Sequence, residues 1–157
     1  MKTNAIRVLE EAGISYRLVE YDVDESDLSA ESVARKVGLP EEQVFKTLAL
    51  RGDKTGVLIA LASAGSELDL KAVAAASGNK HCEMLPLKEV LPVTGYIRGG
   101  CSPLGMKRHY PVYIDETVIF CDEISVSAGL RGLQMLLAPE DLIRLTGAVL
   151  GDFGRPA

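Results

Sequence analysis

A glycine-rich stretch in the second half of the chain, residues 95–107, constrains the fold more than any other segment. It reads G-Y-I-R-G-G-C-S-P-L-G-M-K and contains four glycines and one proline. Glycine loses more conformational freedom on folding than any other residue, and proline lacks the N–H that helix and sheet interiors use. Neither element can run through this segment. We therefore expect a loop whose backbone closely approaches another group.

A lone cation, Lys46, is the second feature to explain, because it lies in an otherwise apolar strand. In V-F-K-T-L-A-L-R, residues 44–51, alternation puts Lys46 on one face with Val44 and Leu48. An unpaired ammonium is costly to bury, which favours an anion or a ligand beside it. A lysine at the edge of a sheet, with its amino group in water, explains the pattern equally well. We expect Lys46 and the glycine-rich loop to face one pocket.

Length and charge limit the classes of function. A chain of 157 residues is expected to form one domain, residues 1–157. The formal net charge of −5 argues against a protein that grips a long stretch of nucleic acid by its phosphates. The chain has no tryptophan and 5% aromatic residues, which argues against an aromatic stacking platform. A nucleic-acid partner is expected to meet only a local basic cluster, formed by Arg98, Lys107 and Arg108.

The cysteines and the apolar runs bear on location. Cys82, Cys101 and Cys121 are odd in number and widely spaced, which argues against a disulfide framework. Residues 1–19 show no signal peptide, and the longest apolar run, residues 57–62, is too short to span a membrane. We expect a cytoplasmic protein with no membrane partner.

Hydrophobic periodicity and turn residues predict a mixed fold. Strands outnumber helices and several are joined by tight turns, which indicates an α/β (α+β) class with a mixed or largely antiparallel, curled sheet and helices on its surface. Helices are predicted over residues 3–12, 30–37, 68–77 and 86–91 and from 139 onward, and strands over 15–22, 44–51, 57–62, 81–85, 111–114, 118–122, 124–127 and 133–137.

The glycine-rich loop offers several kinds of chemistry. Its backbone N–H groups can bind a phosphate, a carboxylate or an ester carbonyl, although a tight turn ahead of a strand has the same composition. Ser102 does not fit a hydrolase nucleophile, because the spacing is G-x-S-x-x-G and Pro103 lacks an N–H for an oxyanion. Cys101 fits a small buried thiol better than a nucleophile. No histidine and cysteine spacing fits zinc, and we expect no metal and no cofactor.

Three motifs taken together resemble the YbaK/EbsC family of aminoacyl-tRNA deacylases. They are V-F-K-T-L at residues 44–48, T-G-Y-I-R-G-G-C-S-P-L-G at 94–105 and S-A-G-L-R-G-L-Q at 127–134. The resemblance runs over nearly the whole chain and looks closest to the Cys-tRNA(Pro) deacylase branch. It implies one α/β domain with a mixed, partly barrel-like sheet and peripheral helices, similar to the editing domain of bacterial prolyl-tRNA synthetases.

The resemblance also implies site residues. Lys46 falls on the functional lysine of the family. A pocket aromatic of well-known members falls near Leu28 or Ser29 here, and Gln134 stands where some members carry an acidic residue, a change that would alter side-chain preference. The residues implied to bind substrate are Tyr21, Gly99, Gly100, Cys101, Ser102, Pro103, Gly105, Gly129, Arg131 and Gln134, and those implied to bind tRNA are Arg98, Lys107 and Arg108.

The activity that the resemblance implies is removal of cysteine mischarged onto tRNA(Pro), by attack of the substrate's own thiol on its ester. The partners would be the acceptor end of the tRNA and prolyl-tRNA synthetase. One rival is an Ala-tRNA(Pro) deacylase in which water attacks the ester, and another is a non-catalytic module that binds aminoacyl-adenylate-like or nucleotide ligands. A third, an envelope-associated interaction protein, is disfavoured because no signal segment is visible.

Overall fold

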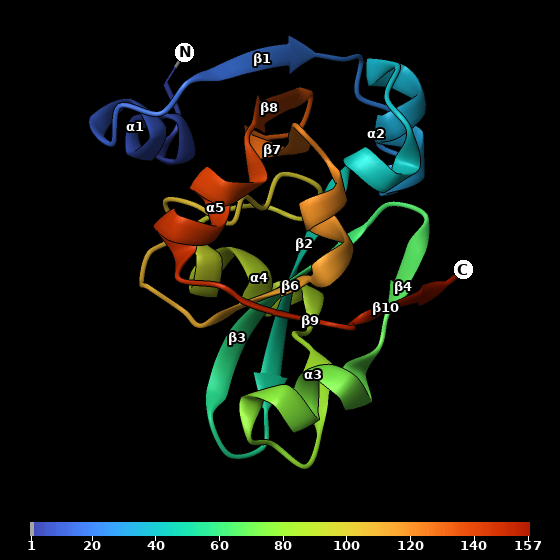
Figure 1. Ribbon diagram of the computed structural model, residues 1–157, viewed down its shortest axis with the longest axis vertical. Coiled ribbons are helices and arrows are strands. Elements are labelled where there is room, and N and C mark those ends of the chain that lie inside the picture. Colours follow the sequence, from blue (N-terminus) through green and yellow to red (C-terminus); the bar gives the residue numbers. More distant parts are fainter. Residues whose placement is uncertain (1) are drawn as a thin grey trace.

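The computed structural model describes residues 2–157, and its helices surround open β-sheets (Figure 1). The helices are α1 (Asn4–Glu11), α2 (Ala30–Val37), α3 (Leu70–Ser77), α4 (Leu87–Thr94) and α5 (Pro139–Thr146), with the short 3-10 helices η1 (Glu41–Gln43) and η2 (Glu116–Phe120). The strands are β1 (Tyr16–Glu20), β2 (Phe45–Gly52), β3 (Gly56–Ser63), β4 (Ser66–Leu68), β5 (Cys82–Met84), β6 (Val112–Asp115), β7 (Ile124–Leu130), β8 (Leu133–Leu137), β9 (Val149–Gly151) and β10 (Gly154–Pro156).

The strands form three sheets, of which only the largest is mixed. The largest runs in the order β5-β2-β3-β6-β9, in which β5, β2 and β3 pair antiparallel whereas β6 pairs parallel with both β3 and β9. A second, antiparallel sheet has the order β1-β8-β7, and β10 pairs with β4. The expected mixed α/β class is confirmed. Over residues 2–157 the sheets stay open, so the expected barrel-like character stops short of a closed barrel.

Strand β2 keeps one edge open near its start. β5 pairs with it only from Leu50 to Gly52, and an isolated parallel bridge joins Val44 to Ser125 at the other end. Among the described residues, no strand pairs with residues 46–48 on this side. The gap in pairing is where the main pocket lies.

Local signals place the helix ends well. The Ser29 side chain accepts a hydrogen bond from the Ser32 N–H at the start of α2, and Gly38 ends that helix at φ 74°. Helix α3 begins at Leu70, later than predicted, because the Asp69 side chain caps it by accepting from the Ala72 N–H. The residues just before this cap form β4, where the sequence predicted a loop and the start of the helix.

The strand predicted over residues 118–122 is wrong, because residues 116–120 form the 3-10 helix η2. The Asp115 side chain caps this turn by accepting from the Thr117 N–H at 3.3 Å. Val118 is buried, whereas Ile119 and Phe120 are 56% and 81% exposed. The run of apolar side chains has the composition of a strand, although the cap and the exposure of its second half favour a turn.

The core positions both the pocket and the loop. The main cluster draws on α1, β2, β6, β8 and α5, through residues such as Leu9, Phe45, Ile114, Met135 and Leu142. A smaller cluster under α3 includes Leu50, Leu58, Val73 and Phe153. Burying each such side chain contributes roughly 1.5–3 kcal/mol. Strand β2 therefore sits between two cores, with Phe45 in one and Leu50 in the other.

Candidate functional site

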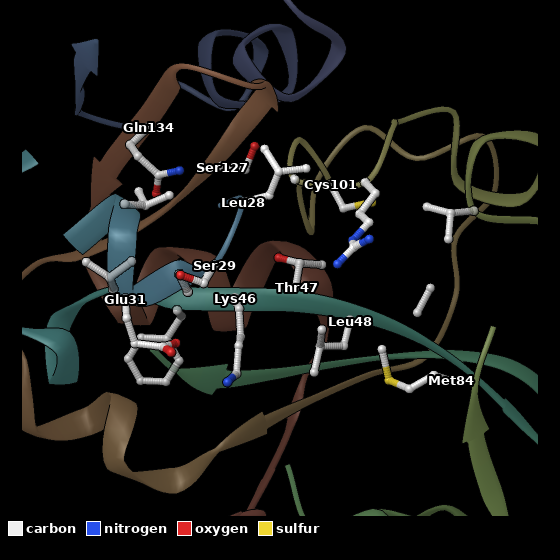
Figure 2. Close-up of a pocket in the computed structure, with 18 of the residues that line it drawn as sticks. Leu28, Ser29, Glu31, Lys46, Thr47, Leu48, Met84, Cys101, Ser127 and Gln134 are labelled. Carbon is white, nitrogen blue, oxygen red and sulfur yellow. The ribbon is translucent and has the colours of Figure 1, made fainter. Parts of the chain in front are cut away.

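The main pocket has a volume of about 520 Å³ and lies along the open edge of β2 (Figure 2). Its walls come from the start of α2, from β5 and α4, from the glycine-rich loop and from β7 and β8. The lining residues are Leu28, Ser29, Ala30, Glu31, Val33, Val44, Phe45, Lys46, Thr47, Leu48, Ala49, Met84, Leu85, Leu87, Val90, Arg98, Gly99, Cys101, Ser127 and Gln134. Lys46 and the glycine-rich loop thus line one pocket, as the sequence predicted.

The half-buried Lys46 is held by a neutral group rather than by a carboxylate. Its Nζ donates a hydrogen bond of 2.5 Å to the carbonyl of Ser66 in β4. No carboxylate of residues 2–157 forms an ion pair with it. Figure 2 shows the Lys46 side chain leaving β2 on the side away from Ser127. An ammonium carries three donors, so two remain for a bound ligand.

Thr47 presents a further polar group that sequence analysis did not single out. Its Oγ1 is buried and has no hydrogen-bond partner among the described residues. A buried polar atom without a partner is rare in native proteins and indicates a ligand or a water molecule as the missing partner. Figure 2 shows this side chain on the face of β2 opposite to Lys46. The only signal in the sequence was a threonine within an apolar strand.

The backbone of β2 adds a donor and an acceptor. The Leu85 N–H donates to the carbonyl of Ala49 at 3.0 Å, so the polar groups of Ala49 point away from β3. Backbone groups two residues apart in a strand point the same way, and those of Thr47 therefore also face the open edge. The pocket floor can hydrogen-bond an ester or an amino group of a ligand.

The glycine-rich loop divides into two halves with different surroundings. Arg98, Gly99 and Cys101 line the main pocket. Pro103 and Gly105 instead line a second cavity of about 270 Å³. Ser102 is fully buried and lines neither cavity. Only the first half of the loop therefore faces the pocket.

Arg131 holds this first half in place. Its Nε donates to the carbonyl of Arg98 at 2.8 Å. A Cβ added to Gly99 would lie 3.3 Å from that Nε, and one added to Gly100 would lie 3.1 Å from the Arg131 backbone nitrogen. The two glycines allow the loop to pack directly on Arg131, which holds the main chain of Arg98 in place.

Cys101 is the thiol of the pocket. Burial raises its pKa, because desolvation disfavours the thiolate. Its Sγ lies 3.7 Å from the carbonyl of Ile97 and 3.9 Å from Oγ1 of Thr94. A neutral thiol is a poor nucleophile, so this environment agrees with the expected packing role.

Gln134 lies at the β8 end of the pocket and is 5% exposed. Its Oε1 accepts a hydrogen bond of 2.8 Å from the fully buried Ser125. Ser127, which also lines the pocket, accepts from the Gly129 N–H at 3.1 Å. At this end the pocket is therefore lined by an uncharged amide rather than by a carboxylate.

Several expected site residues lie outside the main pocket. The Tyr21 N–H pairs with the carbonyl of Gly132, and the tyrosine does not line the pocket. Gly129 packs on Tyr96, whose Cε1 would lie 2.8 Å from an added Cβ. The Lys107 side chain packs on Gly95, and Arg108 lines the second cavity. The structure brings Arg98 to the pocket and leaves the other two cations apart from it.

Leu28 and Ser29 both line the pocket. Side chains smaller than an aromatic ring therefore form this part of its wall. Other lining residues that sequence analysis missed are Glu31, Met84, Leu87, Val90 and Ser127. They belong to short elements whose packing has no local signature.

Over residues 2–157, no group of three or more His, Cys, Asp or Glu side chains could hold a metal ion. None of the helices described is long and apolar enough to cross a membrane.

Comparison with known proteins finds a matching family and a similar relative. The family model for the aminoacyl-tRNA editing domain matches residues 24–145. A protein of Enterococcus faecalis (strain ATCC 700802 / V583), named "Putative Cys-tRNA(Pro)/Cys-tRNA(Cys) deacylase EbsC", is 50% identical over 151 residues, which cover 96% of this chain and 92% of that protein.

Two solved structures share the fold. The crystal structure of "a putative trans-editing enzyme for prolyl tRNA synthetase" has a TM-score of 0.85 at 29% identity and covers 99% of each chain. The crystal structure of a hypothetical protein reaches a TM-score of 0.88 at 20% identity, covering 98% of this chain and 100% of that one. The second likeness bears on the fold alone.

Proposed function

Because the chain belongs to the aminoacyl-tRNA editing domain family, we propose that it is a trans-editing deacylase that removes cysteine from mischarged tRNA(Pro). The name of the relative at 50% identity, which specifies Cys-tRNA(Pro) and Cys-tRNA(Cys), supports this substrate class. The likeness at 29% identity to a protein described as a trans-editing enzyme for prolyl-tRNA synthetase supports that synthetase as a partner. The proposed role in translation fits a cytoplasmic location.

In the proposed reaction the substrate supplies its own nucleophile. The cysteinyl thiol loses its proton, and the sulfur attacks the carbonyl carbon of the ester. The carbon–oxygen bond to the ribose then breaks, and the ribose oxygen takes up a proton. The products are cysteine thiolactone and uncharged tRNA, so the protein needs only to orient the ester and to stabilise the developing oxyanion.

One observation supports this mechanism above the others: the pocket contains a cation and polar donors, but no activated nucleophile. Burial raises the pKa of the Cys101 thiol, which disfavours the reactive thiolate. The lining hydroxyls of Thr47 and Ser127 make no hydrogen bond to a carboxylate or a histidine of the described residues. The Ser29 hydroxyl accepts from the Ser32 N–H, and hydrogen bonds from Ser29 lower the pKa of the Asp27 carboxyl, which makes this carboxylate a poor base. Activation of a serine or threonine requires such a base.

Lys46 is the proposed oxyanion partner. Its Nζ has one donor on the Ser66 carbonyl, and a bound ester would recruit another or replace this contact. The Thr47 N–H, which faces the open edge of β2, is a second donor of the pocket. Charge-assisted hydrogen bonds are about twice as strong as neutral ones, which suits a lysine for this role.

Single-turnover deacylation of Cys-tRNA(Pro), Ser-tRNA(Pro) and Ala-tRNA(Pro) tests the proposal. We expect cleavage of the cysteinyl ester alone, because serine offers a poorer nucleophile of similar size and alanine offers none. Cleavage of the alanyl or seryl ester would contradict the thiol mechanism. It would favour the rival in which an activated water attacks.

Lys46→Ala should lower the single-turnover rate on Cys-tRNA(Pro) by about 100-fold, the usual cost of removing one oxyanion donor. Lys46→Met keeps most of the length of the side chain without its charge, and it should lose as much. Lys46→Arg should retain part of the rate. An undiminished rate for Lys46→Ala, once uncatalysed loss of the ester is subtracted, would remove Lys46 from the mechanism.

A further inference from the structure

Large apolar side chains gather in solvent at one end of the pocket. Met84 at the end of β5 is 47% exposed and Leu87 at the start of α4 is 61% exposed, and both line the pocket. Leu91, one turn further along α4, is 51% exposed and lies on the same helix face as Leu87. Grouped exposed apolar side chains beside a pocket indicate a surface that binds something. We call Met84, Leu87 and Leu91 the apolar ledge.

The ledge lies at the far end of the pocket from Gln134, as Figure 2 shows for Met84. The pocket runs beside residues 44–49, which are Val44 and the first five residues of β2. At the rise of a β-strand this is a length of roughly 17 Å. A single aminoacyl group spans only about 3.5 Å. The pocket is therefore long enough to hold the group to which the amino acid is attached.

A free cation stands beside the same pocket. The Arg98 side chain is exposed and lines the pocket, and its guanidinium has no hydrogen bond or ion pair with any of residues 2–157. Its main chain is fixed, because the Arg98 carbonyl accepts from Arg131 Nε at 2.8 Å. An apolar surface next to an unpaired guanidinium matches a nucleotide, which joins a flat base to a phosphate.

We propose that the apolar ledge binds the terminal adenine of the tRNA, while Arg98 contacts the phosphate of the same nucleotide. The proposal rests on the proposed function, in which the amino acid is esterified to the ribose of this adenosine. The ledge sets the position of the ribose and so directs the ester towards Lys46 and Gly99. Contact of an aliphatic surface and a thioether with a base face is favourable, and it does not require aromatic residues.

Binding of stable substrate analogues tests the ledge separately from the reaction. The probes are fluorescent acceptor-stem RNAs that carry cysteine through an amide bond, which the thiol attack cleaves far more slowly than an ester. One ends in adenosine and the other in the same ribose without its base. We expect the wild-type protein to bind the adenosine probe about tenfold more tightly, which corresponds to about 1.4 kcal/mol of binding free energy.

Leu87→Ser should bind both probes with equal affinity, close to that of the wild-type protein for the baseless probe. Leu87→Met should keep the preference for adenosine. Val149→Ser removes a side chain of similar exposure, 49%, on β9 outside the pocket, and it should behave as wild type. An equal preference for adenosine in wild type and Leu87→Ser, or no preference in wild type, would overturn the proposal.

The outcomes separate the ledge from the proposed function. If wild type prefers the adenosine probe through Leu87 but does not cleave the corresponding cysteinyl ester, the deacylase proposal fails and the adenine site stands. If the ester is cleaved and Leu87→Ser changes neither affinity nor rate, the adenine site fails alone. If Leu87→Ser weakens activity only when prolyl-tRNA synthetase is present, the ledge binds protein and the proposal is wrong.

Discussion

Tyr96 shows how one buried polar group supports the glycine-rich loop. It is 6% exposed, and its hydroxyl donates to the carbonyl of Leu104 at 2.6 Å. Its N–H in turn donates to the Thr94 hydroxyl at 3.0 Å. Burial raises the pKa of Tyr96 to about 12, because the phenolate would lose its hydration. The loop that forms one wall of the pocket thus depends on a proton that the folded protein retains.

This raised pKa predicts a loss of stability in alkali. Between about pH 10 and pH 12 the unfolded chain releases the Tyr96 proton while the folded protein keeps it, so the free energy of unfolding falls as pH rises. The fall for this group is about 1.4 kcal/mol per pH unit. Urea unfolding at pH 8.5 and pH 11 measures it against Tyr96→Phe, which lacks the group.

Tyr96→Phe should be less stable than wild type at pH 8.5 by about 1 kcal/mol, because it loses the hydrogen bond to Leu104. At pH 11 this difference should vanish or reverse. All other titrating groups are shared by the two proteins and cancel. A difference between them that does not depend on pH would contradict the assignment.

The glycine-rich loop as an element depends on close backbone contact with α1. Gly105 has φ 74°, and an added Cβ would lie 2.6 Å from the carbonyl carbon of Asn4 and 2.8 Å from the backbone nitrogen of Ala5. Such distances cannot be relieved by turning a side chain, because the atoms that would clash belong to the backbone of a helix. The loop and α1 must move apart if this glycine is replaced.

Gly105→Ala should therefore destabilise the protein by about 3 kcal/mol, from the positive φ together with the clash. Gly56→Ala is the matched control, because Gly56 has φ 78° but nothing within 4 Å of an added Cβ. It should cost only about 1 kcal/mol, the cost of the conformation alone. Thermal or urea unfolding of both variants measures the difference, and equal losses would show that the contact with α1 contributes nothing.

Across the whole molecule, the C-terminal strand supports the pocket through a chain of contacts. The buried Asp115 side chain accepts from the N–H groups of Phe153 and Gly154, both at 2.8 Å. Strand β10 follows and pairs with β4, where the carbonyl of Ser66 accepts from Lys46. The last residues of the chain therefore help to position the lysine proposed to act on the ester.

Asp115→Asn should lower the free energy of unfolding by about 2 kcal/mol. Each carboxylate oxygen of Asp115 accepts two hydrogen bonds, one oxygen from Thr117 and the other from Phe153 and Gly154. The amide NH2 of asparagine would point its own hydrogens at one of these two pairs of donors. Hydrogen exchange should quicken in β4 and β10. Asp152→Asn is the control, since its exposed pair with Arg155 contributes little. If hydrogen exchange in β4 is unchanged in Asp115→Asn, Asp115 does not help to position Lys46.

The sequence by itself determined the local structure and the family. Caps and stops such as Ser29 and Gly38 placed helix ends, and the alternation in residues 44–51 placed β2. The three motifs led to the family that the comparisons support. These features are readable because caps and periodicity act between residues that are close in the chain.

Only the tertiary structure decided how the segments meet. The strands β4, β9 and β10, three residues each, are too short for alternation to reveal them, and they exist because distant partners supply their hydrogen bonds. The partner of Lys46, the open edge of β2 and the half of the glycine-rich loop that faces the pocket were equally hidden. Periodicity tells which residues share a face, whereas contacts between segments far apart in the chain determine what that face meets.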